Sequence, residues 1–262
     1  MNSILTRLHR ALLPGATLLA LLAILQFLTY SGVLSARAFP LVTDVFAALI
    51  HEASTAEFWL AVGHTLSGWA IGLLIAIVLA VPLGIVLGSS RMLYRGSRTI
   101  IEFLRPVPSV ALIPLAVLVL GIGLESKVFL VVFASFWPML IQTIYGVQDT
   151  DPIATETART FGLGCFETFW RVILPGTAPF IATGFRISSA TALILAVTAE
   201  LVIGSPGLGA TIELARSSGD IATAYAMIMA TGILGWLLNS GSMYFQRRVL
   251  HWHPSQRAGG GS

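Results

Sequence analysis

Charged residues are scarce in this chain of 262 residues. Only 10% of them are Asp, Glu, Lys or Arg, whereas 56% are hydrophobic. A soluble domain usually carries about 25% charged residues. The scarcity therefore excludes an ordinary soluble domain, and the lipid bilayer must be the solvent for most of this protein.

Three further absences narrow the chemistry. The single cysteine, Cys165, excludes an intrachain disulfide and any Cys-x-x-Cys metal motif. No Gly-x-x-x-x-Gly-Lys phosphate loop occurs, so the chain does not carry an ATPase site of that kind. No paired carboxylates or His cluster lies within the apolar runs, which argues against an enzyme or metal site there. One Lys stands against fourteen Arg, which we interpret as genome composition.

Long apolar runs are what the chain has instead. Five windows hold between 19 and 33 consecutive residues without a charge, and a helix needs about 20 residues to cross a bilayer. A sixth run carries Arg186 and closes near Glu200. We therefore predict an all-α, polytopic membrane protein with one transmembrane domain over residues 1–257. Its six expected spans are about 11–34, 62–88, 99–121, 127–148, 178–203 and 221–246.

Arginine placement predicts that both termini are cytoplasmic, because cytoplasmic loops carry an excess of Lys and Arg. The first run could instead be a signal peptide, but its length favours an uncleaved anchor. Residues 258–262, Ala-Gly-Gly-Gly-Ser, resemble an artificial linker. With the N-terminus inside, three positive residues face outward: Arg37, Lys127 and Arg216. Ten then face the cytoplasm: Arg7, Arg10, Arg91, Arg95, Arg98, Arg159, Arg171, Arg247, Arg248 and Arg257.

Residues 152–175 form the longest amphiphilic stretch. Asp151 is a good N-cap and Pro152 a good first helical residue, so we predict a short helix ending at Gly162 in a left-handed conformation. We expect Pro175 to end a second short helix. Four apolar residues recur there at helical spacing: Phe166, Phe169, Trp170 and Ile173.

This stretch resembles the EAA loop of ATP-binding-cassette (ABC) importer permeases, which docks on the cytoplasmic ATPase. The family pattern is Glu-Ala-Ala, three residues, Gly, nine residues, then Ile-x-Leu-Pro. Here Thr157 replaces the middle Ala and Val172 the Ile. The alternative is an amphipathic loop on the membrane surface. The resemblance implies a docking loop over residues 149–177, with these candidate residues: Glu156, Thr157, Ala158, Arg159, Gly162 and Pro175.

A wider resemblance, to type I permeases of the nitrate, sulfonate and taurine branch, covers nearly the whole chain. It implies a second copy of the chain, two ATPase subunits that bind ATP and Mg²⁺, an extracytoplasmic binding protein, and a cell-membrane location in lipid. It implies no cofactor, catalytic residue or nucleic acid in this chain, and a small anion as substrate. Four stretches carry it: His64–Trp69, Glu102–Pro108, Gly184–Glu200 and Arg247–Leu250.

Four charges fall inside or beside the predicted spans: Glu102, Arg105, Arg186 and Glu200. Such charges are costly in lipid and face a partner or a water-filled path. Glu102 could pair with Arg186 or Arg105 to fix helix packing, or these residues could line the translocation path. Both alternatives stay open, and Glu200 is expected near the outer end.

Glycine pairs four residues apart, Gly68 with Gly72 and Gly84 with Gly88, allow close helix approach. We favour packing within the chain over a dimer contact. The rival function is an ATP-independent secondary transporter or channel, which would show inverted repeats or intramembrane acid chains. Neither occurs in the sequence.

Overall fold

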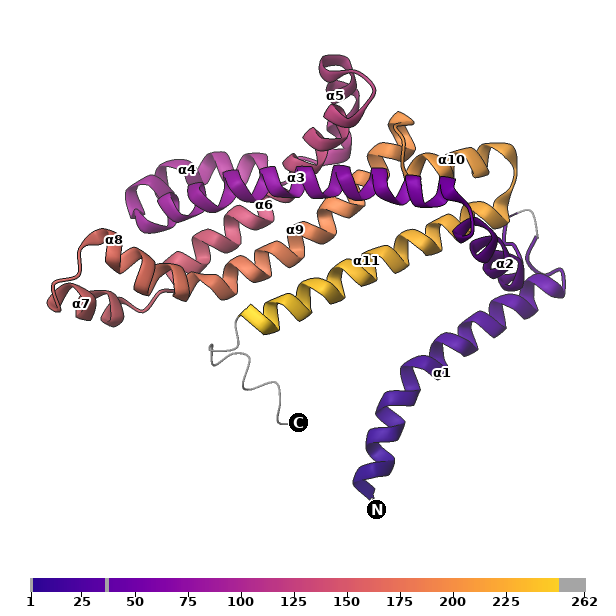
Figure 1. Cartoon of the computed structure of the whole chain (residues 1–262), viewed down its shortest axis with the longest axis horizontal. Helices are drawn as coiled ribbons and strands as arrows, with labels where there is room; N and C mark the ends of the chain where they lie inside the picture. The colour runs from indigo at the N-terminus through magenta and orange to yellow at the C-terminus, as the bar shows by residue number, and fades with distance from the viewer. Residues whose placement is uncertain (1, 36–37, 250–262) are drawn as a thin grey trace. The chain divides into compact units, whose positions relative to one another are not determined.

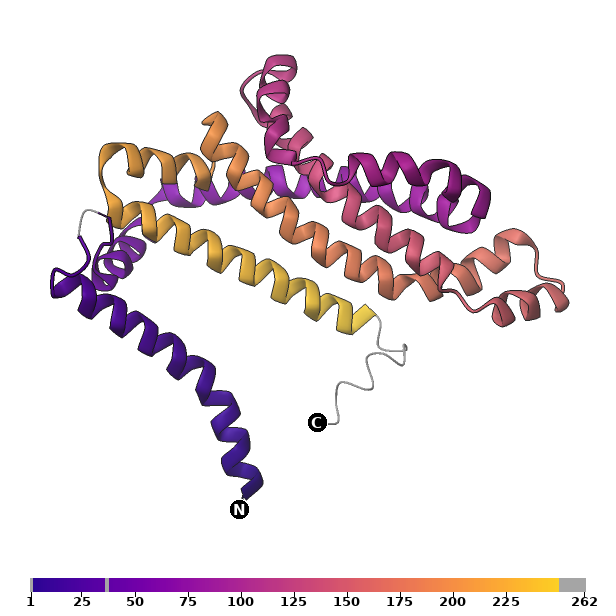
Figure 2. The ribbon, with the colours of Figure 1, turned by 180° about the vertical axis from the view of Figure 1, so that it is seen from behind.

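The computed structural model describes residues 2–35 and 38–249, and the predicted linker at 258–262 lies outside them. The described residues form helices and turns, with no strand among them (Figures 1 and 2). The fold is therefore all-α, as predicted. The chain divides into two compact units, residues 1–60 with 211–231 and residues 61–210 with 232–262.

The larger unit contains most of the helices. It holds α3 from residue 61 onward and the second half of α11, and α10 begins at its border. The bounds of these helices are α3 (Ala56–Ser89), α4 (Arg91–Leu104), η1 (Ser109–Leu112), α5 (Ile113–Leu120), α6 (Leu124–Gln148), α7 (Pro152–Thr160), α8 (Cys165–Thr168), η2 (Phe169–Ile173), α9 (Leu174–Ile203), α10 (Leu208–Ser218) and α11 (Ile221–Val249).

Helices α6 and α9 lie side by side and run antiparallel (Figures 1 and 2). Ser135 of α6 donates to the carbonyl of Ser188 in α9 at 3.2 Å, and the Ser188 hydroxyl donates back to the Ser135 carbonyl at 2.7 Å. Nearer the loop end, a side chain at Gly146 of α6 would meet Phe180 and Thr177 of α9. These contacts fix the register of the two helices.

Glycines of α3 set its register against α6. A Cβ added at Gly72 would lie 2.5 Å from Cγ1 of Val131, and one at Gly84 would lie 2.7 Å from Cβ of Thr143. Gly68 and Gly88 face Lys127 and Val147 in the same way, so each glycine meets the residue 59 positions later. A constant offset means that α3 and α6 are parallel. The glycines serve packing within the chain, as expected.

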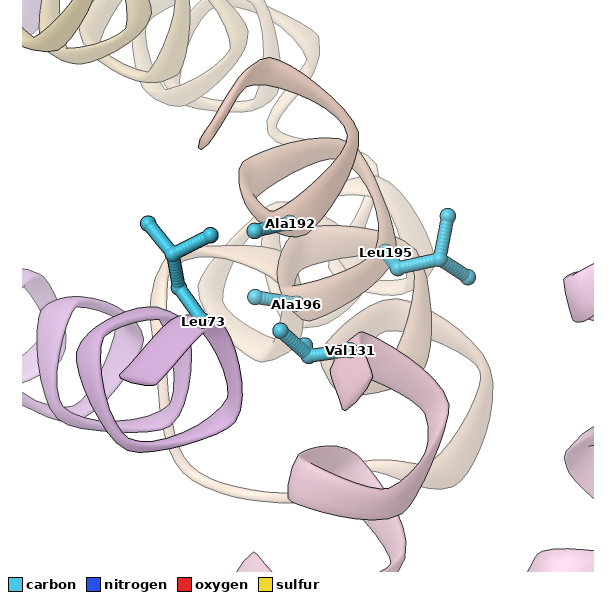
Figure 3. Packing of buried hydrophobic residues seen from close by; sticks show 5 residues of the cluster. All are labelled: Leu73, Val131, Ala192, Leu195 and Ala196. Carbon is cyan, nitrogen blue, oxygen red and sulfur yellow. The ribbon is translucent and has the colours of Figure 1, made fainter. Parts of the chain in front are cut away.

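The apolar core joins these three helices. In one cluster Leu73 of α3 and Val131 of α6 point toward two alanines of α9, Ala192 and Ala196 (Figure 3). Small alanines on α9 let the larger side chains approach its backbone closely. A second cluster centres on Met139 and Leu140 of α6. The third joins α5, α6 and α9 through Ile113, Ala116, Leu130 and Ala199.

The described residues contain four helices long and apolar enough to cross a membrane, or five if one bent pair counts as a span. Spans are thus supported near the predicted 62–88, 127–148, 178–203 and 221–246. The apolar part described in α1 (Asn2–Tyr30) is shorter, covering Gly15–Tyr30. The predicted count of six is therefore not confirmed.

The predicted span 99–121 is broken. Helix α4 ends at Leu104, and Ser109–Leu120 continues at an angle of 78° to it. Pro106 and Pro108 explain the break, because neither has a backbone N–H to donate to the preceding helical turn. Arg105, directly before Pro106, still has helical angles, with φ −57° and ψ −45°. Pro108 is extended, with φ −64° and ψ 113°.

The smaller unit includes α1, α2 (Val42–Ala53) and residues 211–231. Gln26 of α1 accepts from the backbone N–H of Thr43 at 3.3 Å, and the hydroxyl of Tyr225 donates to the carbonyl of Ala38 at 3.1 Å. These bonds tie the two N-terminal helices and the start of α11 into one unit.

Candidate functional site

The loop between α6 and α9 begins with α7. Asp151 accepts a hydrogen bond from the backbone N–H of Ile153 at 2.8 Å, which is the predicted N-cap. Glu156 and Thr157 are exposed, whereas Ala158 is buried. A small residue is suited to this buried position, because α7 lies against η2. The side chain of Arg159 lies outside the described part of the structure.

Gly162 forms the predicted corner. Its φ is +80°, a left-handed conformation that glycine adopts without steric cost. The N–H of Leu163 donates to the carbonyl of Ala158 at 3.1 Å. A bond from the second residue past the cap residue, here Phe161, back to the last helical turn defines a Schellman motif. The corner is therefore a capped, ordered element.

Pro175 does not end a helix, contrary to the sequence prediction. The π-helical turn η2 runs from Phe169 directly into α9, and Pro175 lies in the first turn of α9. In η2 the N–H of Leu174 donates to the carbonyl of Phe169, five residues back. This wider turn lets the chain continue where a proline cannot donate.

Large apolar side chains cover the outside of this loop. Phe161 is 80% exposed and Phe166 75%, and Ile153 and Trp170 are also exposed. The continuous helix Phe166–Ile203 has 38 residues, which is about 57 Å at 1.5 Å per residue. That exceeds the ~30 Å of hydrocarbon, so part of it and the preceding loop extend beyond the bilayer.

An ion pair is buried at the opposite end of α6 and α9. Lys127 Nζ lies 2.9 Å from Glu200 Oε1, and the two residues are 2% and 0% exposed. Lys127 also donates to the carbonyls of His64 and Pro206, at 3.0 and 3.1 Å. All three ammonium hydrogens thus have acceptors. The pair joins α3, α6 and α9.

The second carboxylate oxygen of Glu200 organises the loop after α9. It accepts from the Thr65 hydroxyl at 2.9 Å and from the N–H of Gly209 at 3.0 Å. Thr65 in turn accepts from the N–H of Leu208 at 2.9 Å. A side chain at Gly207 would overlap the Glu200 carboxylate. Glycine at this position is what allows the carboxylate to be enclosed.

Sequence reasoning missed this role for Lys127. Genome composition alone does not account for the single lysine, because Lys127 is buried in the ion pair with Glu200. Lys127 is also not a loop charge of the outer side, since it lies inside α6. The sequence predicts that Glu200 is a charge inside or beside a span. Its partner Lys127 lies 73 residues away, and no local pattern predicts that the two pair.

The structure does not contain the ion pairs that the sequence suggested for Glu102, with Arg186 or with Arg105. Glu102 accepts from Arg98 one helical turn earlier, at 2.7 Å, and both side chains are exposed. Among the described residues, neither Arg105 nor Arg186 has a carboxylate partner within 4.0 Å. The structure therefore brings together neither the Glu102–Arg186 nor the Glu102–Arg105 pair. Arg105 instead lines a cavity of about 240 Å³ with residues of η1, α6 and α9.

Comparison with known families gives one match that covers most of the chain. Residues 80–251 match the family described as "Binding-protein-dependent transport system inner membrane component". The taurine transport system permease protein TauC of Escherichia coli is 33% identical over 198 residues, 76% of this chain and 72% of TauC. The nitrate import permease protein NrtB of Leptolyngbya laminosa is 30% identical over 193 residues, 74% of this chain and 69% of NrtB.

A solved structure supports the fold. The methionine ABC transporter MetNI, in inward-facing conformations, contains a chain with a TM-score of 0.64 to this one. The match covers 75% of this chain and 99% of that chain, at 20% identity. The helical arrangement is thus shared although the sequences have diverged.

Proposed function

We propose that this chain is the path-forming subunit of an ATP-driven importer of a small anion. The basis is that it belongs to the family of binding-protein-dependent transport system inner membrane components. Its relatives TauC and NrtB confirm the expected branch of ABC permeases. The family and the apolar helices make it a multi-pass membrane protein. Two copies would form the path, and an extracytoplasmic binding protein would deliver the substrate.

The observation that carries the proposal is the apolar surface on the loop between α6 and α9. Phe161 and Phe166 are exposed on a segment that extends beyond the span. Exposed apolar patches outside the bilayer mark binding sites for other proteins. Glu156 and Thr157 are exposed beside them on α7, where an ATPase could contact them.

Coupling would pass from α7 to α9. Helix α7 lies against η2, and η2 continues into α9 without a break. Closure of two ATPase subunits would displace α7, and the displacement would reach the membrane through α9. Hydrolysis, ATP and Mg²⁺ belong to the ATPase in this proposal, so this chain supplies motion and a path and no catalytic residue.

The substrate class follows from the relatives by similarity. TauC is described as a taurine permease and NrtB as a nitrate permease, and both names point to a small oxyanion group, sulfonate or nitrate. We extend this class to the present chain. Uptake that needs ATP and the binding protein distinguishes it from a secondary transporter, which would work without either.

Copurification of the ATPase tests the docking loop. The double variant Phe161→Ser/Phe166→Ser should lose the ATPase of the same transporter, because both side chains would sit in the contact. The control is Ile122→Ser, since Ile122 is 73% exposed at the far end of α6. Full retention of the ATPase by the double variant, or equal loss from the control, would contradict the assignment.

A further inference from the structure

Two cavities meet at Arg105 in the larger unit. The first, of about 240 Å³, is lined by residues that include Arg105, Ser109, Trp137 and Gln142. The second, of about 80 Å³, is lined by residues that include Arg98, Glu102 and Arg105. Both also share Ile141. The two cavities are therefore neighbours that share Arg105 and Ile141 in their walls, and together they are called the recess.

Four of the residues that line the larger cavity carry hydrogen-bond donors, and the other four are apolar. The Arg105 guanidinium carries five N–H groups, and Ser109, Gln142 and Trp137 add a hydroxyl, an amide and an indole N–H. Its lining contains no Asp or Glu. Such a set of donors, with a positive charge among them, matches the oxygens of a small oxyanion.

The indole N–H of Trp137 gives the most specific evidence. Its Nε1 is buried and has no hydrogen-bond partner among the described residues. A buried donor left without a partner is costly and calls for an explanation. Phe133 and Phe136 contact the ring edge to face, with centroids 5.9 and 5.1 Å away. The ring is thus packed against two aromatic neighbours, neither of which offers an acceptor oxygen.

The charged residues that line the recess leave a net positive charge, which favours an anion. Glu102 is neutralised by Arg98 at 2.7 Å, and Arg105 has no carboxylate partner among the described residues. One positive charge therefore remains where the donors gather. Arg105 is itself exposed, so its guanidinium is accessible to a solute at the cavity.

The break between α4 and η1 positions this charge. Arg105 directly follows the last residue of α4, and Ser109 begins η1. Broken helices place backbone and side-chain donors at transport sites in other membrane proteins. The Pro106-Val107-Pro108 turn brings both residues to one cavity.

We propose that this cavity is the anion-holding site of the permease, with Arg105, Ser109, Trp137 and Gln142 as ligands of a sulfonate or nitrate group. The inference rests on the proposed import function. Arg105 would supply the charge and a forked pair of N–H groups. Trp137 would supply an N–H donor, which disfavours a solute that has no hydrogen-bond acceptor. Both residues would act after the binding protein has released its cargo.

Uptake by the reconstituted transporter, with its ATPase and binding protein in proteoliposomes, tests the site. The probes are labelled nitrate and labelled taurine. Arg105→Gln and Trp137→Phe should each lower uptake of the transported probe by about tenfold or more, as loss of a hydrogen bond to a charged group predicts. Arg105→Lys should keep part of the rate, because it keeps the charge without the fork.

Matched controls separate the site from general damage. Arg95→Gln removes an exposed arginine of α4 that lines neither cavity, and Trp236→Phe removes an exposed indole N–H on α11. Both should keep uptake near that of the unmodified protein. Uptake by Arg105→Gln at half or more of the unmodified rate, or losses in the controls equal to those in the site variants, would overturn the proposal.

A binding measurement on the purified full chain makes the outcome independent of transport. Sodium methanesulfonate should raise the melting temperature above that in sodium chloride of equal ionic strength, because a ligand stabilises the state that it binds. Arg105→Gln and Trp137→Phe should abolish this rise. A rise that persists in both variants contradicts the site. If the rise occurs as expected and neither probe is transported, the site stands and the proposed import function fails.

Discussion

Lys127 and Glu200 form a buried ion pair in which Nζ and Oε1 are 2.9 Å apart, although 73 residues separate them in the chain. The only lysine of the protein is therefore enclosed by α3, α6 and α9, at the end of α6 and α9 opposite the loop that joins them. The same carboxylate holds the loop that follows α9 through the N–H of Gly209. This one contact thus fixes three helices and the start of α10.

Removing one member of the pair should destabilise the protein strongly. Lys127→Met and Glu200→Leu should each lower the free energy of unfolding by about 3–5 kcal/mol, because the remaining charge is left buried without its partner. The double variant should recover part of this loss. Denaturant unfolding in detergent micelles, followed by circular dichroism, measures all three.

The surface pair Glu213–Arg216, in which Arg216 is exposed and Glu213 half-buried, supplies the control for this cycle. Glu213→Gln should change stability much less than the Lys127 and Glu200 variants do, because solvent screens this surface pair. If the Lys127 variant loses no more than this control, the pair does not hold the three helices together. A double variant as unstable as the sum of the singles would show that the two side chains act independently.

The glycines of α3 should tolerate no side chain where α6 passes. Gly72→Ala should cost about 1–3 kcal/mol through overpacking against Val131. Pairing it with Val131→Ala should restore part of the stability. Gly63→Ala is the control, because it lies on the same helix with nothing within 4 Å of an added Cβ. Equal thermal unfolding of Gly72→Ala and Gly63→Ala would refute the α3–α6 register.

Local signals explain what the sequence could predict. The cap at Asp151 and the corner at Gly162 depend on neighbouring residues, and both occur where the pattern placed them. The positions of α3, α6 and α11 follow from long charge-free runs, and that of α9 follows from an apolar run interrupted by Arg186. Helices α3 and α6 are parallel and α9 is antiparallel to α6, which agrees with the predicted order of spans if the broken segment 99–121 crosses between α3 and α6.

Long-range and backbone effects explain what was missed. The partner of Glu200 is distant in sequence, so only the fold reveals it. Pro106 and Pro108 lie at the break after Leu104, but the apolar run that surrounds them predicts one continuous span. The sequence around Pro175 predicts a helix stop, because the π-turn that accommodates this proline leaves no pattern in the sequence.

The docking corner should be sensitive to its backbone conformation. Gly162→Val should strain the Schellman motif by about 1–2 kcal/mol, because a left-handed φ is unfavourable for a residue with a Cβ. An added Cβ meets nothing within 4 Å, so the strain is in the backbone and not in packing. Transport should fall while the protein still inserts and folds.

Gly164→Ala is the matched control for the corner, since Gly164 has equal space and no left-handed φ. ATP-dependent uptake and the yield of folded protein should both be measured for the two variants. Wild-type uptake by Gly162→Val would show that the corner has no part in coupling, and equal loss in both variants would assign the effect to the loop in general.

The last prediction concerns orientation, for which the two ends of α6 provide probes. Lys127 is buried and cannot count as an outer loop charge, so the arginine bias toward the cytoplasmic side is stronger than the sequence suggested. In a Cys165→Ser background, Phe161→Cys and Ile122→Cys place single thiols at exposed positions at opposite ends of the helix. A membrane-impermeant maleimide should label Ile122→Cys in intact cells that lack the ATPase. It should label Phe161→Cys only in inverted vesicles, because the docking loop must reach a cytoplasmic enzyme. Labelling of Phe161→Cys from outside would reverse the orientation and with it the docking proposal.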